Sequence, residues 1–304
     1  MISIENVTKT FGPATVLNHV SLDIPPGKIT IVAGADGAGK STLFKILLGL
    51  LKKDHGTIKL NQRKVDRDHK EITSICGYMP EKFSLYPDLT VEENMNFFAD
   101  IQGVPVSRRE ELKEKLLART GMILFKKRRA GALSGGMKQK LALSTILLSA
   151  PQLVILDEPT TGVDPLSRLE FFDIINDLKE EGKTILMSTP YLEEAEKGDY
   201  VIFLNQGVVT TQDTIANLKN NFTARIFNIL PSGNIYDLVE KLQQKEAFKE
   251  NIYIKGKYLK FIQEEDAGLL KQIPHQEITE QQPTLEDIYL YYQKKTAGDQ
   301  SQRA

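Results

Sequence analysis

The stretch "ITIVAGADGAGKSTLFKILLGLL", residues 29–51, decides the fold of this chain. It opens with a short apolar run of the kind that a buried parallel strand needs. It closes with "LFKILLGLL", which is apolar at helical spacing. Between them lies Gly34–Ser41, which fits the pattern G-x-x-x-x-G-K-[ST]. A strand, a glycine-rich loop and a helix therefore follow one another directly, which predicts an α/β fold with a phosphate-binding loop (P-loop).

The residue types of this loop suit the binding of phosphate groups. Glycines let backbone N–H groups curl into a cradle for phosphate oxygens, and the following helix points its positive end at the same anion. Lys40 reaches the outer phosphates, and the hydroxyl of Ser41 is placed to hold Mg²⁺, which keeps several waters and needs few protein ligands. The residues expected to contact the nucleotide are Gly34, Ala35, Asp36, Gly37, Ala38, Gly39, Lys40, Ser41 and Thr42.

A second apolar run, "LVILDE", ends in two neighbouring carboxylates, Asp157 and Glu158. One carboxylate at the end of a buried strand can hold a metal ion, and the next can orient and polarise an attacking water molecule. An ordinary acidic turn at a strand end is the alternative interpretation. Next to a P-loop, the pair predicts hydrolysis of a nucleotide, with Lys40 and Glu158 as the catalytic residues.

The stretch "LSGGMKQ", residues 133–139, forms a second helix start that suits an anion. Ser134, Gly135 and Gly136 come directly before the helix pattern "MKQKLALSTILL", and a helix N-terminus carries a positive partial charge. One chain with two phosphate-type sites is unusual unless two chains share their nucleotides. The pattern therefore favours an arrangement in which two chains share nucleotides.

With these motifs in this order, residues 1 to about 215 resemble the ATPase subunits of ABC transporters. The matching stretches are "GADGAGKST", "LSGGM", "LVILDEP" and "TTGVDP". The resemblance implies a RecA-like P-loop ATPase core with an inserted helical subdomain. It also implies two such domains packed head to tail, with each ATP between one P-loop and the partner's LSGG stretch. The implied cofactors are ATP and Mg²⁺, and the implied partners are a membrane permease subunit and a second ATPase domain in a homodimer or a heterodimer.

The resemblance assigns roles to further residues. Phe11 stands where the family stacks an aromatic ring on adenine. Glu81 stands where the family usually has a glutamine that touches Mg²⁺ and the attacking water, and Glu adds a charge there. Asp36 stands where asparagine is commonest, and it suits a turn before Gly37. The implied metal ligands are Ser41, Asp157 and Glu81.

Two stretches narrow the resemblance further. Residues 77–101 and 188–196 resemble the ATPases of bacterial multidrug-type exporters, above all the first half of subunits with two ATPase domains in tandem. The C-terminal stretch "TLEDIYL" resembles the accessory domain of exporter ATPases. The expected domains are an ABC ATPase domain at 1–220 with a helical subdomain at about 88–150, a small α/β accessory domain at 221–292, and a flexible tail at 293–304.

Pro190 departs from the family pattern. The family normally places a histidine after the Ser188–Thr189 corner, where it hydrogen-bonds the γ-phosphate and holds the attacking water. Proline has neither a side-chain donor nor a backbone N–H, and no histidine lies near it in sequence. We therefore predict a site that binds MgATP but hydrolyses it slowly, while the LSGG stretch completes a better site on a second ATPase.

Composition narrows the function classes. The net charge of −1 and the pI near 6.5 predict no broad basic surface and no nucleic-acid partner. No apolar stretch approaches the length that crosses a bilayer, so a membrane role would come through a partner. We expect a cytoplasmic protein held peripherally at the inner face of the cell membrane by the permease. Cys76, the single cysteine, is expected to be a buried, inert thiol.

Two other function classes stay open. In a non-hydrolytic switch subunit, ATP would only hold a complex together, with no dependence on Glu158. A non-transport ATPase of the same superfamily would act on nucleic acid or ribosomes. Repair-related members carry long coiled coils between the motif halves, and the translation factors carry two cores with a charged linker. This sequence shows neither feature.

Overall fold

The computed structural model describes residues 2–65, 69–82, 85–245, 248, 251–264 and 268–301. Contacts within the chain divide it into two compact units, Met1–Gln212 and Asp213–Ala304. The first unit holds every motif that the sequence singles out for nucleotide chemistry. Each unit is described by itself below.

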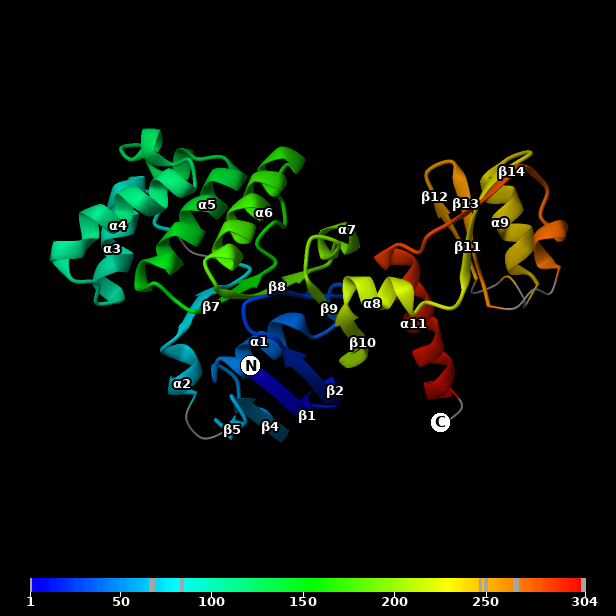
Figure 1. Ribbon diagram of the computed structural model, residues 1–304, viewed down its shortest axis with the longest axis horizontal. Helices are drawn as coiled ribbons and strands as arrows, with labels where there is room; N and C mark the ends of the chain where they lie inside the picture. The colour runs from blue at the N-terminus through cyan, green and yellow to red at the C-terminus, as the bar shows by residue number, and fades with distance from the viewer. Residues whose placement is uncertain are drawn as a thin grey trace. The chain divides into compact units, whose positions relative to one another are not determined.

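A six-stranded sheet forms the centre of the first unit, in the order β10-β9-β3-β8-β7-β6 (Figure 1). Its neighbours β9 and β3, β3 and β8, β8 and β7, and β7 and β6 all pair in parallel. The segments that follow these strands therefore leave from one edge of the sheet, where α/β proteins bind ligands. The strands are β3 (Ile29–Ala33), β6 (Cys76–Met79), β7 (Leu153–Asp157), β8 (Thr184–Thr189), β9 (Tyr200–Asn205) and β10 (Val208–Thr214).

The apolar runs read as buried strands are strands in the structure. All residues of β3 and β7 are buried, as expected where layers of structure cover both faces of a parallel sheet. The run "YVIFLNQGVV", residues 200–209, predicts one strand from its sequence, and this prediction is wrong: the chain forms two adjacent strands, β9 and β10. The chain turns at Gln206 and Gly207, whose φ angles are both positive, +46° and +77°. Two such residues form a tight hairpin turn, and only the glycine signals it in the sequence.

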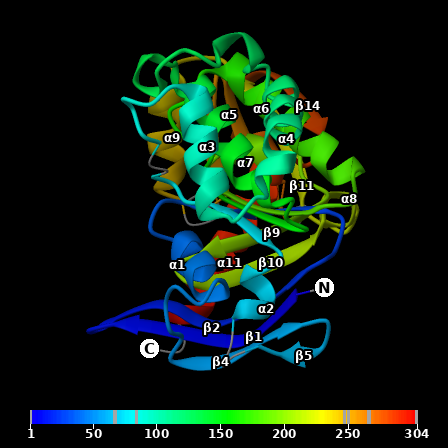
Figure 2. The ribbon, with the colours of Figure 1, turned by 90° about the vertical axis from the view of Figure 1, so that its left-hand side faces the viewer.

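A second, antiparallel sheet has the strand order β2-β1-β4-β5. It covers the side of helix α1 (Lys40–Leu47) that faces away from the six-stranded sheet (Figure 2). Figure 2 shows α1 between this sheet and strands β9 and β10. One core of buried apolar residues joins all three layers and includes Leu22 of β2, Phe44 of α1 and Ile202 of β9. This packing fixes α1 directly behind the P-loop. The strands are β1 (Ile2–Phe11), β2 (Ala14–Ile24), β4 (His55–Leu60) and β5 (Arg63–Lys64).

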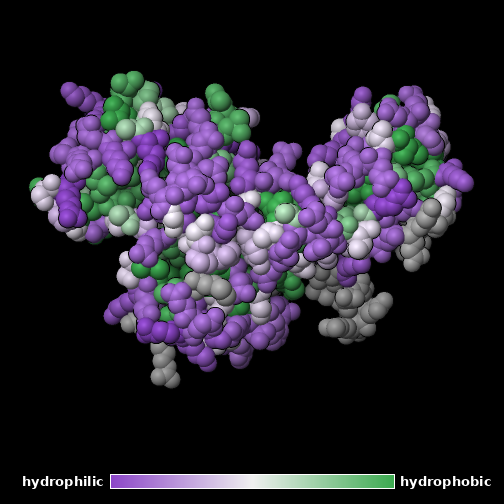
Figure 3. Space-filling model, viewed as in Figure 1, coloured by the Kyte–Doolittle hydropathy of each residue, from purple (hydrophilic) through white to green (hydrophobic). Residues whose placement is uncertain are grey.

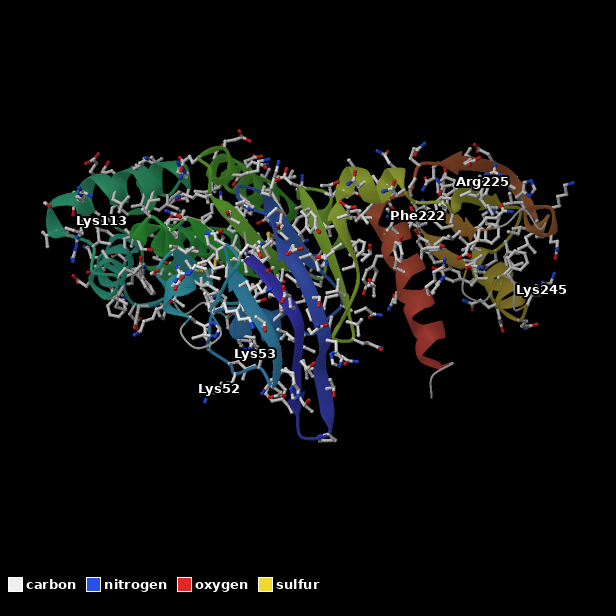
Figure 4. The ribbon with its side chains drawn as sticks, turned by 60° about the horizontal axis from the view of Figure 1, so that its bottom comes forward. Lys52, Lys53, Lys113, Phe222, Arg225 and Lys245 are labelled. Atoms are coloured by element: carbon white, nitrogen blue, oxygen red, sulfur yellow. The ribbon has the colours of Figure 1, made fainter. Side chains whose placement is uncertain are left out.

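A helical segment lies between β6 and β7 in the chain. The sequence "TVEENMNFFADI" predicts a capping box at Thr90 and Glu93, which the structure confirms. The Glu93 N–H donates to the Thr90 hydroxyl, and the Thr90 N–H donates to the Glu93 carboxylate. Lys113 of α4, labelled in Figure 4, is buried and donates to Asn96 Oδ1 of α3 at 2.7 Å. The helices of this segment are α3 (Val91–Ile101), α4 (Val106–Arg119), η1 (Ile123–Phe125), η2 (Ala130–Ala132), α5 (Gly135–Ile146) and η3 (Leu147–Ser149). The other helices of the first unit are α2 (Lys70–Thr73), α6 (Pro165–Glu180) and α7 (Leu192–Ala195).

The second unit is a four-stranded antiparallel sheet in the order β12-β13-β11-β14, with helices on both faces. Leu242 of α9 packs with Phe227 and Phe261 on one face. Tyr291 of α11 packs with Ile226 and the partly buried Phe222 on the other, and Figure 4 labels Phe222. Its elements are α8 (Ile215–Asn220), β11 (Arg225–Pro231), α9 (Ile235–Gln243), β12 (Ile252–Lys255), β13 (Tyr258–Gln263), η4 (Leu269–Gln272), β14 (His275–Gln281) and α11 (Leu285–Ser301).

The C-terminal stretch differs from the expectation. Helix α11 continues to Ser301, through most of the stretch 293–304 expected as a tail; residues 302–304 lie outside the described residues. Its start is held by Thr284, whose N–H and hydroxyl both donate to Asp287 Oδ2. Asp287 is fully buried and also accepts from the Tyr253 hydroxyl at 2.6 Å. The "TLEDIYL" stretch thus begins the helix that covers one face of the small sheet.

Candidate functional site

The P-loop connects β3 to α1 along a backbone path that needs glycine. Gly37 and Gly39 have φ angles of +78° and +105°, which side-chain-bearing residues rarely adopt. Gly34 is required for a different reason: a Cβ there would lie 2.1 Å from the carbonyl oxygen of Leu204 in β9. The loop is therefore pressed against β9 at Gly34.

Because Gly34 has no room for a Cβ, Gly34→Ala is expected to displace the loop from β9. Overpacking of this kind costs about 1–3 kcal/mol of unfolding free energy, which is a fall of several degrees in Tm for a unit of this size. Nucleotide affinity should fall with it. The matched control is Gly233→Ala, where a Cβ meets nothing within 4 Å. Thermal unfolding and nucleotide titration measure both effects, and a Gly34→Ala protein that matches the control in both would contradict this description of the loop.

Lys40 is buried at the start of α1 with all three of its ammonium donors in use. Its Nζ donates to the carbonyl oxygens of Gly34 at 2.8 Å and Ala35 at 3.0 Å. It also lies 3.1 Å from Glu158 Oε1 in an ion pair whose side chains are 3% and 11% exposed. Charge-assisted contacts in so little water are strong. The predicted phosphate ligand and the predicted catalytic carboxylate are thus brought into direct contact.

The two carboxylates after β7 lie at the same edge of the sheet and are fixed by Ser188 of β8. The Ser188 hydroxyl donates to Asp157 Oδ1 at 2.6 Å and accepts from the Glu158 N–H at 2.9 Å. Glu158 has a φ of +49°, a left-handed conformation that costs about 1–2 kcal/mol for a residue with a Cβ. Its Oε2 accepts from the Thr161 hydroxyl at 3.3 Å. These contacts hold Glu158 turned toward Lys40.

A cavity of about 530 Å³ opens at this edge of the sheet. Its lining brings the P-loop together with Glu81, which follows β6, and Glu158, which follows β7. Asp157, the residue before Glu158 in the chain, is buried and is not among the described lining residues. The described lining residues are Val16, Asp36, Gly37, Gly39, Lys40, Ser41, Thr42, Glu81, Glu158 and Thr161. Of the predicted nucleotide contacts, Gly34, Ala35 and Ala38 belong to the same loop but do not line this cavity.

The donor set at the cavity fits Mg²⁺. Ser41 offers a hydroxyl, and Asp157 and Glu81 offer carboxylates, all of them oxygen ligands of the kind this ion prefers. In the part of the chain that the structure describes, no three or more His, Cys, Asp or Glu residues are grouped as a metal cluster. A magnesium ion that keeps most of its waters and binds phosphate oxygens needs no such cluster.

The Pro190 corner follows β8, between the P-loop strand β3 and the carboxylate strand β7. Ser188 and Thr189 are fully buried, and the Gly34 N–H donates to the Thr189 carbonyl oxygen at 3.3 Å. The corner therefore touches the P-loop through the backbone and Asp157 through Ser188. Pro190 itself is not among the described lining residues of the cavity, and its side chain has no hydrogen-bond donor.

The LSGG stretch forms the exposed N-terminus of α5. Ser134 is the N-cap, and its hydroxyl accepts from the Met137 N–H at 3.3 Å. Gly136 is buried, and a Cβ there would lie 2.5 Å from the Ser167 side chain of α6. Ser134, Gly135 and Gly136 are absent from the described lining of the Lys40 cavity. The two predicted anion sites are therefore separate on one chain.

Two further predicted residues have clear surroundings. Phe11 ends β1 as an exposed ring, with Lys9 Nζ 5.1 Å from its centroid. It is available to stack on a ligand but lines no part of the described cavity. Cys76 is half-buried in β6, and desolvation raises the pKa of its thiol to about 12. The thiolate is suppressed at neutral pH, so the predicted inertness of Cys76 is supported.

Sequence reasoning missed several residues at this site. The Thr161 hydroxyl donates to the Glu158 carboxylate, and the Ser188 hydroxyl donates to the Asp157 carboxylate and accepts from the Glu158 N–H. Glu194 accepts from Thr160 and Thr189 behind the Pro190 corner. Thr160 and Thr161 stand in the recognised "TTGVDP" stretch, but no spacing rule links them to the corner about 30 residues later. Their partners follow from the adjacency of β7 and β8, which the sequence does not state.

The sequence matches known proteins over most of its length. A family model described as ABC transporter matches residues 17–161. The probable multidrug ABC transporter ATP-binding protein YbhF of Escherichia coli (strain K12) is 36% identical over 273 residues, which cover 88% of this chain and 47% of that protein. The chain therefore spans about half the length of this relative. The lantibiotic transport ATP-binding protein SrtF of Streptococcus pyogenes is 37% identical over 231 residues, covering 74% of this chain and 97% of that protein.

Solved structures match the fold. The dimeric structure of MJ0796, a bacterial ABC transporter cassette, has a TM-score of 0.64 at 28% identity, covering 71% of this chain and 99% of that one. This match confirms the predicted P-loop ATPase architecture. In the described residues, no helix has both the length and the apolar character needed to cross a bilayer.

Proposed function

Since this chain belongs to the ATP-binding proteins of ABC transporters, we propose that it binds MgATP in the Lys40 cavity and drives a membrane permease of an export system. The observation that carries the proposal is the meeting of Lys40, Ser41 and Glu158 at one cavity. The export direction is supported by the relatives whose names refer to multidrug and lantibiotic transport. The protein would act at the inner face of the cell membrane, held there by the permease.

In the proposed mechanism, Lys40 and the P-loop N–H groups neutralise charge on the outer phosphates of ATP. Mg²⁺ held by Ser41 and Asp157 would supply further neutralisation of the phosphate oxygens. Glu158 orients a water molecule for in-line attack on the γ-phosphorus, and the bond to the ADP oxygen breaks. Binding of the phosphates takes Lys40 away from Glu158, which frees this carboxylate for the water.

A second ATPase domain completes the proposed machine. Ser134, Gly135 and Gly136 are separate from this chain's own cavity, and the exposed N-cap can reach the γ-phosphate on a partner. The partner is either a second copy or a different ATPase. The MJ0796 cassette, whose structure is dimeric, supports pairing of this kind.

The proposed permease contact is the helical segment with the loop before it. Asn94 of α3 fixes the exit of this loop, because its amide donates to the carbonyl oxygens of Tyr86 and Thr90 and its Oδ1 accepts from the Tyr86 N–H. Figure 3 shows apolar side chains at the surface of this segment, and Leu124 is 90% exposed. Exposure of apolar side chains to water does not stabilise a domain that works alone, so their presence here favours a surface that contacts a partner.

We further propose that hydrolysis at this chain's own P-loop is slow because Pro190 supplies no donor. Pro190→His is expected to raise kcat of the purified complex by about 10-fold or more, since one preorganised contact to the transition state is commonly worth on the order of 10²–10³ in rate. Pro190→Ala removes the ring without adding a donor and is the control. A histidine variant no faster than the alanine variant would show that the corner does not limit turnover.

The non-hydrolytic switch is the second candidate function, and Pro190 is the feature that favours it. Steady-state MgATP hydrolysis and ATP binding by the purified chain separate the two. Turnover above that of Glu158→Gln means an active enzyme, in which two copies suffice. Binding without turnover, with ATP-dependent association, favours the switch or a site that needs a different second ATPase.

A further inference from the structure

A buried carboxylate lies behind the Pro190 corner and has no role in the chemistry described so far. Glu194, on the short helix α7, is 6% exposed. Its Oε2 accepts from the Thr189 hydroxyl at 2.5 Å and from the Thr160 hydroxyl at 2.9 Å. Thr189 ends β8, and Thr160 lies in the turn after β7. One carboxylate oxygen therefore joins the two segments that border the nucleotide cavity.

The other oxygen of this carboxylate is not satisfied. Glu194 Oε1 is buried and has no hydrogen-bond partner among the described residues, although Arg168 Nη1 of α6 lies 3.7 Å away. A buried charged oxygen without a donor is costly, so its persistence calls for a reason. Arg168 donates through Nε to the Val163 carbonyl oxygen at 2.8 Å and stacks over Tyr191 with 4.5 Å to the ring centroid. Arg168 therefore contacts both the turn at residues 160–164, through Val163, and the corner, through Tyr191.

The Thr189–Pro190 corner is in turn hydrogen-bonded to the P-loop. The Thr189 hydroxyl, while donating to Glu194, accepts from the Tyr191 N–H at 3.0 Å. The carbonyl oxygen of Thr189 accepts from the Gly34 N–H at 3.3 Å. Pro190, which stands between them, has no N–H with which to anchor the corner. Thr189 is thus bonded to Glu194 through its hydroxyl and to the start of the P-loop through its carbonyl oxygen.

We propose that Glu194 is a positioning residue for the nucleotide site. It holds the Thr189–Pro190 corner against the P-loop. Because it is also bonded to Thr160, the position of the corner is coupled to the position of the turn at residues 160–164. Arg168 Nη1 of α6 lies 3.7 Å from the unsatisfied Oε1 and is a cation that faces this carboxylate. The inference rests on the proposed function, because it concerns the same site.

The first test is amide hydrogen exchange on the full chain, which needs no turnover. In Glu194→Gln the charged acceptor of the Thr189 hydroxyl is lost, so the Gly34 and Tyr191 amides are expected to exchange about tenfold faster. Strand β9 should keep its protection. The control is Glu193→Gln, an exposed neighbour on the same helix. Unchanged exchange at Gly34 and Tyr191 would overturn the proposal, and so would an equal acceleration in β9, which would mean a general loss of stability.

Thr160→Val is the second variant, in case Glu194→Gln folds poorly. It removes one donor to Glu194 without touching the charge or the corner. Tyr191 exchange is expected to rise by a smaller factor than in Glu194→Gln, and exchange as in the unaltered chain would count against the proposal.

Kinetics give an independent reading of the same cluster. Glu194→Gln is expected to lower kcat several-fold while the Kd of ATP stays within about twofold, because the residue places the corner and does not touch the nucleotide. Arg168→Gln combined with Glu194→Gln should cost less than the sum of the two single changes. Strict additivity would remove Arg168 from the proposal. If neither the chain nor its complex hydrolyses ATP, the proposed enzyme function fails, and the exchange experiment still decides the role of Glu194.

Discussion

Glu158→Gln is expected to lower the turnover of MgATP by about 10²–10⁴-fold, the usual range for loss of a general base. Glutamine keeps the shape of the side chain and the contact with Thr161, but it cannot accept a proton from the attacking water. ATP affinity should not weaken, because the phosphates are held by Lys40 and the P-loop. The measurements are steady-state phosphate release and nucleotide titration on the same preparation.

The matched control for this variant is Glu180→Gln. Glu180 is the last residue of α6 and is exposed. Among the described residues, it forms one ion pair, with its neighbour Lys179 at 3.7 Å. This change should leave turnover and affinity unaltered, since exposed pairs are worth little. If Glu158→Gln hydrolyses ATP as fast as Glu180→Gln, the water is activated elsewhere and the assignment of Glu158 as catalytic residue is wrong.

Lys40→Ala is expected to raise the Kd of ATP by about 10–10²-fold. A hydrogen bond to a charged group contributes about 1.5–3 kcal/mol, and Lys40 is the buried cation that lines the phosphate end of the cavity. The change also leaves Glu158 without its partner at 3.1 Å, which adds repulsion toward an incoming phosphate. Titration with ATP and ADP measures the effect.

Lys45→Ala on the same helix is the control for Lys40→Ala. Lys45 lies on the exposed face near the end of α1, where its charge faces solvent. Its removal should leave the Kd within about twofold, because exposed charges are screened. Equal affinities for the two variants would mean that the nucleotide does not bind at the P-loop cavity.

The parts of the fold that were predictable are those that a local pattern determines. The run before Gly34 and the run before Asp157 are apolar on both faces, so they had to be buried strands. The capping box at Thr90 depends on residues three apart and was read directly. The hairpin at Gln206 was missed because a glutamine with positive φ leaves no trace in composition. The helical end of α11 was missed because its residues are polar, as a frayed tail would be.

The site was predictable where one motif contains both partners. Lys40 and Ser41 are neighbours in the P-loop, and Asp157 and Glu158 are neighbours after β7. The Lys40–Glu158 contact joins residues far apart in the chain, and only the shared edge of the sheet brings them together. The Glu194 cluster depends on β7 and β8 being neighbours, which no periodicity encodes.

The ion pair between Lys40 and Glu158 makes this carboxylate a tethered competitor of ATP. A group held in place by the chain acts at a high effective concentration, so any phosphate must displace an anion that never diffuses away. The affinity for nucleotide therefore depends on how much more favourably Lys40 interacts with phosphate than with Glu158. In the proposed mechanism, Glu158 would bind the ammonium group again once the γ-phosphate has been cleaved and released, and would help to expel ADP. The residue proposed to activate the water would then also reset the subunit for the next ATP.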